Sequence, residues 1–374
     1  MTMWHECTLG DVLTLKRGYD LARDTRQPGP YPVVSSAGVT DFHAEAKAKG
    51  PGVVTGRYGT LGEVFFVVSD FWPLNTALYV QDFKGNDPRF TCYLLKTLNI
   101  AARDAAGAVP GVNRNHLHAI NVRVPAIATQ RRISAILSAY DDLIENCQRR
   151  IRILEDMARG LYREWFVRFR FPGADALPRV DSPLGPIPHG WGVRKLGDVL
   201  QLNYGKALKK ETRRDGSVPV FGSSGVVGRH DESLASGPGI IVGRKGNVGS
   251  VFWCDEPFFV IDTAYYVTAS LPLRFLFYDL QTMNFINNDS AVPGLSRHQA
   301  YALDTLIPPA DLLSQFCQFA DCFEAQAATH RRQITNLRRT RDLLLPRLLS
   351  GQITLASAEP EQASFRAAGS SALA

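Results

Sequence analysis

Two long stretches of the chain carry apolar residues at alternating steps of three and four. The first starts near Thr129 and keeps this spacing for four heptads, to Leu161. The second runs from Leu313 to Leu344 and is interrupted by the polar residues His330 and Arg341. Such spacing places one stripe of side chains on one face of a helix and is typical of a coiled-coil seam. We therefore predict two long antiparallel helices that pack on each other, the second less regularly. The predicted seam residues are Ile133, Leu137, Tyr140, Ile144, Ile151, Leu154, Leu161, Phe316, Phe323, Ile334, Leu337 and Leu344.

Before each of these helices the pattern changes to short β-prone runs. Gly, Pro, Asn and Asp separate these runs, as expected for strands joined by turns. A helix is predicted after each set of strands, near 91–105 and near 273–284. The pattern predicts an α+β fold for both segments. The predicted strands are 52–55, 63–68 and 77–80, then 239–242, 250–253 and 264–267.

The two strand-rich segments are copies of one sequence. Trp4–Val12 (WHECTLGDV) returns as Trp191–Val199 (WGVRKLGDV), an offset of 187 residues. The same offset relates the glycine-rich segments that begin at Gly56 (GRYGTLG) and Gly243 (GRKGNVG), and it becomes 183 at the two Ala-Val-Pro-Gly segments. A period this long indicates domain duplication and excludes a solenoid, whose repeats run to about 20–50 residues.

These patterns divide the chain into six parts. Two tandem homologous domains alternate with the two long helices, a linker rich in Pro and Gly follows the first helix, and a small polar tail ends the chain and is predicted to be disordered. The predicted parts are domain 1 at 1–127, a helix at 128–170, the linker at 171–189, domain 2 at 190–309, a helix at 310–351 and the tail at 352–374.

Composition is that of an ordinary globular protein with a modest positive charge. The net charge of +6 and the pI of about 9.0 are compatible with a polyanionic partner. No apolar stretch is long enough for a membrane span, and the N-terminus lacks a signal-peptide pattern, so we expect a cytoplasmic protein. The six cysteines include no C-x-x-C pair, which favours reduced thiols over disulfides or zinc.

Catalytic signatures are missing from the sequence. It contains no G-x-x-x-x-G-K-[ST] phosphate loop, no G-x-G-x-x-G opening a strand–helix unit and no Asn/Asp-Pro-Pro-aromatic tetrapeptide. His116 and His118 are close in a predicted loop but lack a third ligand, which favours surface histidines over a metal site.

Three residues imitate a metal-dependent nuclease, namely Asp41, Glu45 and Lys47. Their spacing is short for two acids that approach one ion from separate strands. The duplicated scaffold does not need the trio, because the second half has other residues there: Gly228, Glu232 and Leu234. We predict neither a nuclease nor a metal site.

Candidate DNA contacts gather at matched positions of the two halves. The glycine-rich segments, with their adjacent basic residues, fit either a phosphate cradle or a tight hairpin. After each Val-Pro-Gly come side chains of the kinds that read base edges, although a solvated turn remains the alternative. Further basic positions in predicted loops fit phosphate contacts. The candidates are Lys16, Arg17, Arg57, Tyr58, Asn113, Arg114, Asn115, His116, Lys206, Lys209, Arg244, Lys245, Ser296, Arg297, His298 and Gln299.

The order of these features resembles the specificity subunit of type I restriction-modification systems, over essentially the whole chain. Each motif is weak alone, but their order, twice over and separated by seam helices, is specific. The motifs that carry the resemblance are Gly190–Trp191 with Lys195–Asp198, Val242–Gly246, Asp262–Tyr266, Ala291–Ser296, Trp165–Val167 and Leu343–Gly351.

The resemblance implies that each domain reads one half of a bipartite double-stranded DNA target. It also implies that the helices act as a spacer and dock two methyltransferase subunits, in a complex that includes restriction and translocase subunits. Helices of about 45 Å could hold two readers one DNA turn apart. Catalysis would belong to the partners, so S-adenosylmethionine, ATP and Mg²⁺ are expected there and this chain is expected to be non-catalytic. The alternative is an orphan DNA-binding or scaffold protein that acts without a methyltransferase.

Overall fold

A computed structural model describes residues 4–100, 111–285 and 294–355. The chain divides into two compact units. Unit 1 comprises Met1–Asn146 and Gln333–Ala374, and unit 2 comprises Cys147–Arg332. Each unit joins one copy of the repeat to a part of both long helices, α5 (Ile127–Tyr162) and α9 (Ala310–Leu349).

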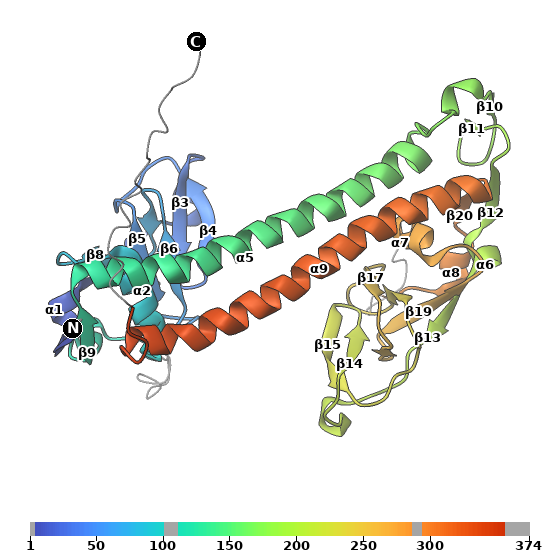
Figure 1. Ribbon diagram of the computed structural model, residues 1–374. Coiled ribbons are helices and arrows are strands. Elements are labelled where there is room, and N and C mark those ends of the chain that lie inside the picture. The colour runs from blue at the N-terminus through green and yellow to red at the C-terminus, as the bar shows by residue number, and fades with distance from the viewer. Residues whose placement is uncertain (1–3, 101–110, 286–293, 356–374) are drawn as a thin grey trace, which may run out of the picture. The chain divides into compact units, whose positions relative to one another are not determined.

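Unit 1 is built from a four-stranded sheet, a three-stranded sheet and a separate strand pair (Figure 1). The four-stranded sheet has the order β2-β8-β5-β6, the three-stranded sheet is β4-β3-β7, and β1 pairs with β9. Helix α2 packs on β5 and β6. The elements are β1 (Trp4–Thr8), α1 (Leu9–Val12), β2 (Thr14–Arg17), β3 (Tyr31–Ser35), β4 (Gly38–His43), β5 (Gly52–Gly56), β6 (Val64–Val67), β7 (Trp72–Pro73), β8 (Ala77–Asp82), α2 (Pro88–Thr97), α4 (Arg114–His118) and β9 (Asn121–Pro125).

Unit 2 repeats this topology strand for strand. Its sheets have the orders β13-β19-β16-β17 and β15-β14-β18, β12 pairs with β20, and β10–β11 is a pair of its own. Its elements are β10 (Arg179–Val180), β11 (Ile187–Pro188), β12 (Gly192–Lys195), α6 (Leu196–Val199), β13 (Leu200–Tyr204), β14 (Val218–Gly222), β15 (Gly225–His230), β16 (Gly239–Gly243), β17 (Val251–Cys254), β18 (Phe259–Val260), β19 (Ala264–Ala269), α7 (Leu273–Thr282), α8 (Arg297–Tyr301) and β20 (Asp304–Ile307).

The duplication and the α+β class are thus confirmed at the level of strand register. In unit 1 Thr55 on β5 faces Leu78 on β8, and in unit 2 Val242 on β16 faces Tyr265 on β19, at positions that differ by the predicted 187 residues. All six predicted strands are present.

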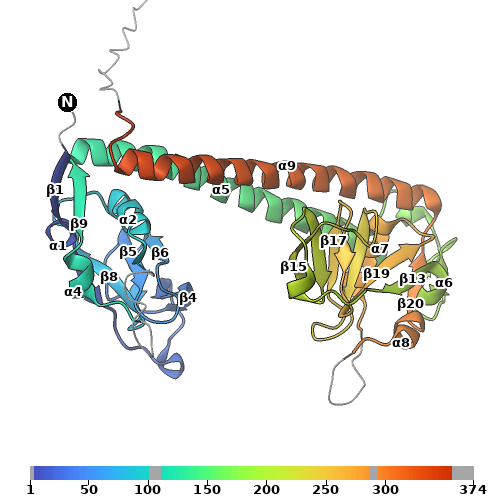
Figure 2. The same ribbon diagram turned by 90° about the horizontal axis from the view of Figure 1, so that it is seen from below.

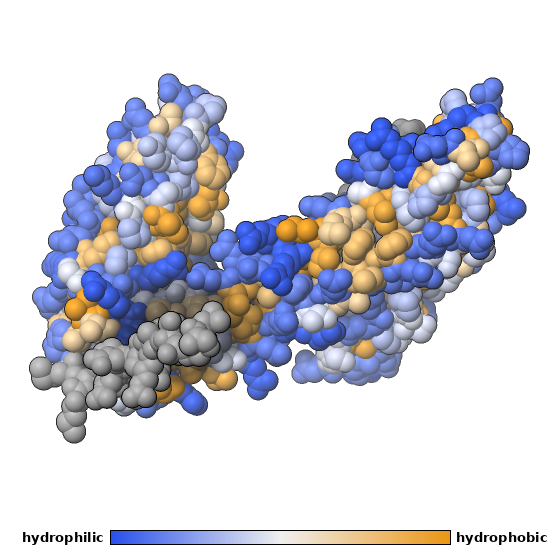
Figure 3. Space-filling view, turned by 45° about the horizontal axis from the view of Figure 1, so that its top comes forward, coloured by the Kyte–Doolittle hydropathy of each residue, from blue (hydrophilic) through white to orange (hydrophobic). Residues whose placement is uncertain are grey.

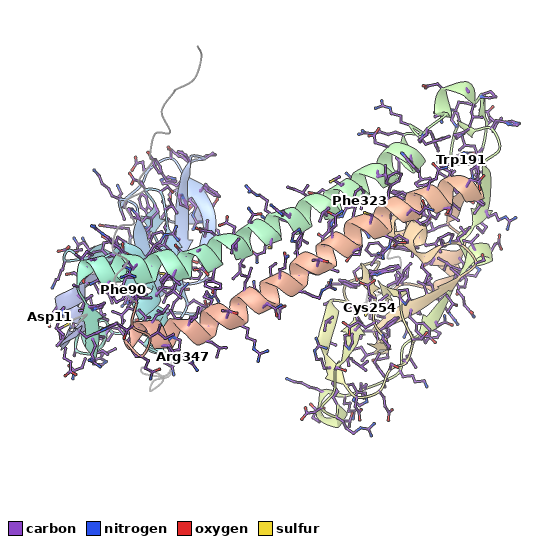
Figure 4. The ribbon with its side chains drawn as sticks, viewed as in Figure 1. Asp11, Phe90, Trp191, Cys254, Phe323 and Arg347 are labelled. Carbon is purple, nitrogen blue, oxygen red and sulfur yellow. The ribbon has the colours of Figure 1, made fainter. Side chains whose placement is uncertain are left out.

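The seam side chains of both helices face the interior, since all twelve are buried or half-buried. In unit 1, Ile133 and Leu137 on α5 share a core with Leu348 on α9 and with Phe90 on α2. Phe90 is labelled in Figure 4. The irregular seam residue Arg341 is neutralised, because its guanidinium lies 2.6 Å from the carboxylate of Asp141.

Unit 2 has an aromatic core formed where α5 ends and α9 begins. The rings of Tyr162 and Phe316 are 5.9 Å apart, and Phe166 lies against both Phe316 and Trp191. Glu155, earlier on α5, pairs with Arg331, later on α9, at 2.8 Å. The helix segments of this unit therefore run antiparallel, as predicted.

Some predicted bounds were wrong. The first short helix begins at Pro88, because Asp87 caps it by accepting a hydrogen bond from the backbone N–H of Phe90 at 2.8 Å. It ends at Thr97, and Asn99 adopts a positive φ of 46° that does not continue a helix. Residues 101–105 of this prediction lie outside the described part.

The first long helix was predicted to reach residue 170, yet α5 ends at Tyr162 and a π-helical turn, Arg163–Val167, follows. The predicted linker, 171–189, is not wholly irregular. It contains the β10–β11 pair, and Ile187 is buried in the core of unit 2 with Trp191. Burial of Ile187 and the stacking of Phe171 on Trp191 at 5.3 Å fold this segment onto the unit. The predicted disordered tail, 352–374, is described only to residue 355. For that short part the prediction was wrong, because Ile353 and Leu355 pack against the core of unit 1.

All six cysteines are free thiols. Within the described ranges, no helix has the length and apolar character needed to cross a membrane.

Candidate nucleic-acid interface

In unit 1 the first candidate group lies on the tight turn between β5 and β6. The backbone N–H groups of Arg57 and Tyr58 donate to the carbonyl of Thr76 at 2.9 and 3.1 Å. A Cβ at Gly56 would lie 1.9 Å from the carbonyl oxygen of Thr60, and Gly59 has a φ of 81°, so both positions require glycine. The hairpin alternative thus accounts for these glycines.

The second candidate group forms a helix, and its prediction as a loop was wrong. Residues 114–118 make α4, and the side chain of Asn113 caps it by accepting a hydrogen bond from the N–H of Asn115 at 3.0 Å. Asparagine is a strong N-cap, which is why a polar run becomes a helix here. The side chains of Arg114, Asn115 and His116 are exposed.

These groups of unit 1 come together, although they are far apart in the sequence. The N–H of Val112 donates to the carbonyl of Arg57 at 2.9 Å, which ties the segment before α4 to the glycine-rich turn. Arg17, Arg57 and Arg114 then line one cleft of about 530 Å³, with Tyr58 and Asn113. Arg17 belongs to strand β2 together with Lys16, so the prediction of a loop there was wrong.

Unit 2 holds its candidates with the same backbone contacts. The N–H groups of Arg244 and Lys245 donate to the carbonyl of Thr263 at 2.9 and 3.0 Å, and the N–H of Leu295 donates to the carbonyl of Arg244 at 2.8 Å. Ser296 is the residue before α8, which starts with Arg297, and α8 lies beside β13 and β20 (Figure 2).

The outer candidates of unit 2 differ in their surroundings. His298 and Arg297 line an open depression of about 900 Å³. Gln299 is half-buried. Lys206 and Lys209 lie in the segment after β13 with exposed side chains, and the structure shows no contact that joins them to Arg244 or Arg297 among the residues it describes.

Tyr204 belongs to this site, and the sequence analysis did not identify it. The guanidinium carbons of Arg244 and Arg297 lie 4.8 and 4.3 Å from the centre of its ring. Tyr204 occupies the place of Arg17 in the 187-residue alignment. A residue-by-residue comparison of the two halves would have pointed to this position.

The short helices α4 and α8 are anchored to the neighbouring strands by different side chains. His118 Nε2 accepts a hydrogen bond from the N–H of Leu15 at 2.9 Å, and the Tyr301 hydroxyl accepts one from the N–H of Leu202 at 2.9 Å. Partial burial lowers the pKa of His118, and the positive charge of Arg114 lowers it further. His118 therefore has a structural role in unit 1.

Both acids of the trio Asp41, Glu45 and Lys47 are paired with cations. Arg26 donates to the carboxylate of Asp41 at 2.9 Å and thereby lowers the pKa of that carboxyl, while Lys47 lies 3.4 Å from Glu45. In the described part of the chain, no three His, Cys, Asp or Glu side chains are placed to hold a metal ion. The candidate sites of both units thus present cationic and amide side chains, which can bind an anionic ligand.

Comparison with known protein families decides the identity of this scaffold. The family model for the type I restriction modification DNA specificity domain matches residues 1–155 and 188–310, which include both copies of the repeat. The chain belongs to this family. Its role is DNA sequence specificity, and it is a specificity subunit, which is the non-catalytic component of a type I restriction-modification complex. Its partners are accordingly DNA and other subunits of such a complex, and the orphan alternative gains no support.

Two relatives from Methanocaldococcus jannaschii illustrate the similarity. The type I restriction enzyme MjaIX specificity subunit is 26% identical over 323 residues, which are 75% of this chain and 73% of the relative. The MjaVIII specificity subunit is 24% identical over 220 residues, 55% of this chain and 51% of the relative. The fold is shared with the crystal structure of the S subunit from M. genitalium, with a TM-score of 0.62, 17% identity and coverage of 93% of this chain and 96% of that one.

Proposed function

We propose that unit 1 and unit 2 each read one half of a bipartite target in double-stranded DNA. The observation that carries this proposal is the repeated geometry of the basic site. In both units the same backbone hydrogen bonds bring an arginine of the glycine-rich turn next to an arginine of a short helix. Arginine forms bidentate hydrogen bonds with guanine and also binds phosphates, so such a site suits a DNA groove.

The two sites differ in the residues that surround their arginines. Unit 1 presents Asn113, Asn115 and His116, and unit 2 presents Ser296, His298 and Gln299. Amides, hydroxyls and imidazoles select different base edges, so two unlike sets on one scaffold support two different half-site sequences.

The proposal is tested by replacing the matched arginines one at a time. The target is first obtained by mapping adenine methylation in host DNA with and without this gene. We expect Arg114→Ala to relax recognition of one half-site and Arg297→Ala to relax recognition of the other, each by about 10- to 100-fold in Kd ratio. Binding is measured with the chain in complex with its methyltransferase subunits, on duplexes in which one or the other half is scrambled.

Matched controls remove an exposed arginine elsewhere in the same unit. Arg123→Ala on β9 and Arg194→Ala on β12 should leave half-site discrimination unchanged. If Arg114→Ala and Arg297→Ala both discriminate as the wild type does, α4 and α8 do not read DNA.

The helices supply the proposed docking surfaces for two methyltransferase subunits. In unit 2 the side chains of Ile153 and Met157 on α5 and Phe319 on α9 are about half exposed. Hydrophobic residues interrupt the hydrophilic surface on the face that Figure 3 shows. In unit 1, Leu143 and Leu343 are similarly exposed. Apolar side chains on outer helix faces favour a protein partner.

Charge placed on this surface tests the docking proposal. Ile153→Glu with Met157→Glu should abolish co-purification of a methyltransferase subunit, because it would bury two carboxylates against apolar surface. Ser314→Glu, an exposed polar position on α9, is the control for added charge. Unchanged subunit stoichiometry in the double variant would place the docking surface elsewhere.

S-adenosylmethionine, ATP and Mg²⁺ are proposed to bind the partner subunits.

A further inference from the structure

The site of unit 2 is organised around the ring of Tyr204, and the guanidinium carbon of Arg244 also lies 5.8 Å from the ring centre of Tyr265. Tyr204 is the last residue of β13, and 47% of its surface is exposed. The guanidinium carbons of Arg244 and Arg297 are 4.8 and 4.3 Å from the ring centre. Both lie within the roughly 6 Å at which a cation is attracted to an aromatic face.

A buried frame holds the ring and the two backbones that carry the arginines. Tyr204 faces Tyr265 across the β13–β19 pair, with ring centres 5.2 Å apart. The buried hydroxyl of Tyr265 donates to the carbonyl of Leu295 at 3.0 Å, and the N–H of Leu295 donates to the backbone carbonyl of Arg244 at 2.8 Å. Burial raises the pKa of Tyr265 to about 12, so its hydroxyl keeps the proton that it donates.

Each guanidinium has one further contact to the main chain. Nη1 of Arg244 donates to the carbonyl of Asp262 at 3.1 Å, and Nη1 of Arg297 lies 3.4 Å from the carbonyl of Leu202. A guanidinium has five N–H donors, so most of its donors stay available for another partner. Arg244 and Arg297 are both half-buried, which agrees with their position over the ring.

Unit 1 has no tyrosine at the positions that match Tyr204 and Tyr265. Arg17 stands where unit 2 has Tyr204, and Leu78 stands where unit 2 has Tyr265. Arg57 lies over its own neighbour Tyr58 at 4.4 Å, and the side chain of Arg114 is exposed. The ring is therefore a property of unit 2 and not of the shared scaffold.

We propose that Tyr204 is a positioning residue for half-site recognition by unit 2, and that its ring orients the Arg244 and Arg297 guanidinium groups as a preorganised pair for the bases. This inference rests on the proposed DNA-reading role of α8. Without the ring, the two arginine side chains would repel each other and adopt many conformations in water. DNA binding would then carry the entropic cost of ordering them. The planar guanidinium is suited to such stacking because it is weakly hydrated on its faces.

The test uses the full chain in complex with its methyltransferase subunits. One fluorescein-labelled duplex carries the motif identified by methylation mapping. The other carries the same motif with the half-site of unit 2 scrambled. That half-site is the one for which Arg297→Ala relaxes discrimination. We expect Tyr204→Leu to weaken binding of the intact motif by about tenfold and to change binding of the scrambled duplex by less than about twofold.

Two further results distinguish positioning from a loss of charge or of a ring contact. The slope of log Kd against log salt should not change in Tyr204→Leu, because both cations remain. Tyr204→Phe should bind the intact motif as the wild type does, because it keeps the ring.

A double-mutant cycle separates positioning from a defect in folding. In a chain that already carries Arg244→Ala and Arg297→Ala, the further change Tyr204→Leu should have no effect on Kd, because the ring has nothing left to orient. A folding defect would weaken binding in that background as well, and this result would overturn the inference.

Two other outcomes are decisive. If Arg297→Ala loses discrimination and Tyr204→Leu does not, the arginines read DNA without the ring and only this inference fails. If neither variant changes discrimination, α8 is not a reader, and the proposed function of unit 2 fails together with the inference.

Discussion

The two units have the same sheets in the same strand order, yet they hold their cations differently. In unit 1, Arg17 and Arg114 are exposed around the cleft, whereas in unit 2 Arg244 and Arg297 lie over Tyr204. The backbone frame is therefore a common support, and a few side chains decide what the arginines of its basic site pack against. A duplicated reader can change what it recognises without changing its fold.

The segments that follow β2 in unit 1 and β13 in unit 2 show a second difference. In unit 1, residues 18–30 include two basic and two acidic residues, whereas residues 205–217 of unit 2 include five basic and two acidic ones. Lys206, Lys209 and Lys210 are exposed there, while Arg214 pairs with Asp231 and Glu232. Unit 2 thus has more exposed lysine charge on the segment after β13, which favours phosphate contacts.

The interiors of the units also differ, at one matched helix position. Helices α2 (PRFTCYLLKT) and α7 (LRFLFYDLQT) align without gaps, so Asp279 occupies the place of Leu94. The carboxylate of Asp279 is buried and accepts hydrogen bonds from the hydroxyls of Tyr162 and Thr305, both at 2.7 Å. Unit 2 therefore joins α7, the end of α5 and β20 by a polar network at a point where unit 1 has an apolar contact.

The largest expected effect comes from removing this network. Asp279→Ala should destabilise unit 2 by about 3 kcal/mol, because two buried hydroxyls lose their acceptor. Hydrogen exchange of the α7 amides measures the change in unit 2, and exchange of the α2 amides in unit 1 should stay the same. Equal loss of protection in both helices would show that the two units unfold together.

The isosteric control also tests the charge on Asp279. Burial raises its pKa, so the folded unit favours the protonated carboxyl. Its contribution to stability is then present at low pH and is lost as the pH rises from the ordinary aspartate range through the raised pKa. Asp279→Asn keeps a group that can accept from one hydroxyl and donate to the other, so it should cost less than about 1 kcal/mol and remove this pH dependence.

A smaller effect is expected from the anchors of α4 and α8. His118 Nε2 accepts from the N–H of Leu15 only when that nitrogen is unprotonated. The hydroxyl oxygen of Tyr301 always has a lone pair, so its acceptance from the N–H of Leu202 carries no such condition. Because burial lowers the pKa of His118, its contribution is complete above the unfolded value of about 6.5 and declines as the pH falls through the lower folded value.

Amide exchange at the two anchored strands measures this difference. Between pH 7.5 and pH 5, protection of the Leu15 amide should fall by a few-fold after correction for intrinsic exchange, and protection of the Leu202 amide should not change. His118→Tyr copies the anchor of unit 2 and should abolish the fall at Leu15. A pH response that persists in this variant would have to come from another group.

Periodicity predicted the parts of the fold that depend on local sequence. Alternating steps of three and four identified the faces that α5 and α9 bury, because such spacing repeats on a helix. The β-prone runs identified the central strands. Prediction was weakest at element ends, where a single contact decides, as with the Asp87 cap on α2 and the Asn113 cap on α4. The linker was misjudged because its Pro and Gly content conceals the burial of Ile187.

The sequence by itself determined that the chain is a duplicated reader on seam helices, because a repeat and a period are visible in one dimension. It also placed basic side chains at matched positions of the two copies. Only the tertiary structure decided that Arg57 and Arg114 line one cleft and that Arg244 and Arg297 lie over one ring. The members of each pair are more than 50 residues apart in the sequence, and backbone hydrogen bonds to Arg57 and Arg244 bring the two segments together. The role of Tyr204 likewise depends on a strand pairing, because a ring orients a cation only where the fold brings the two together.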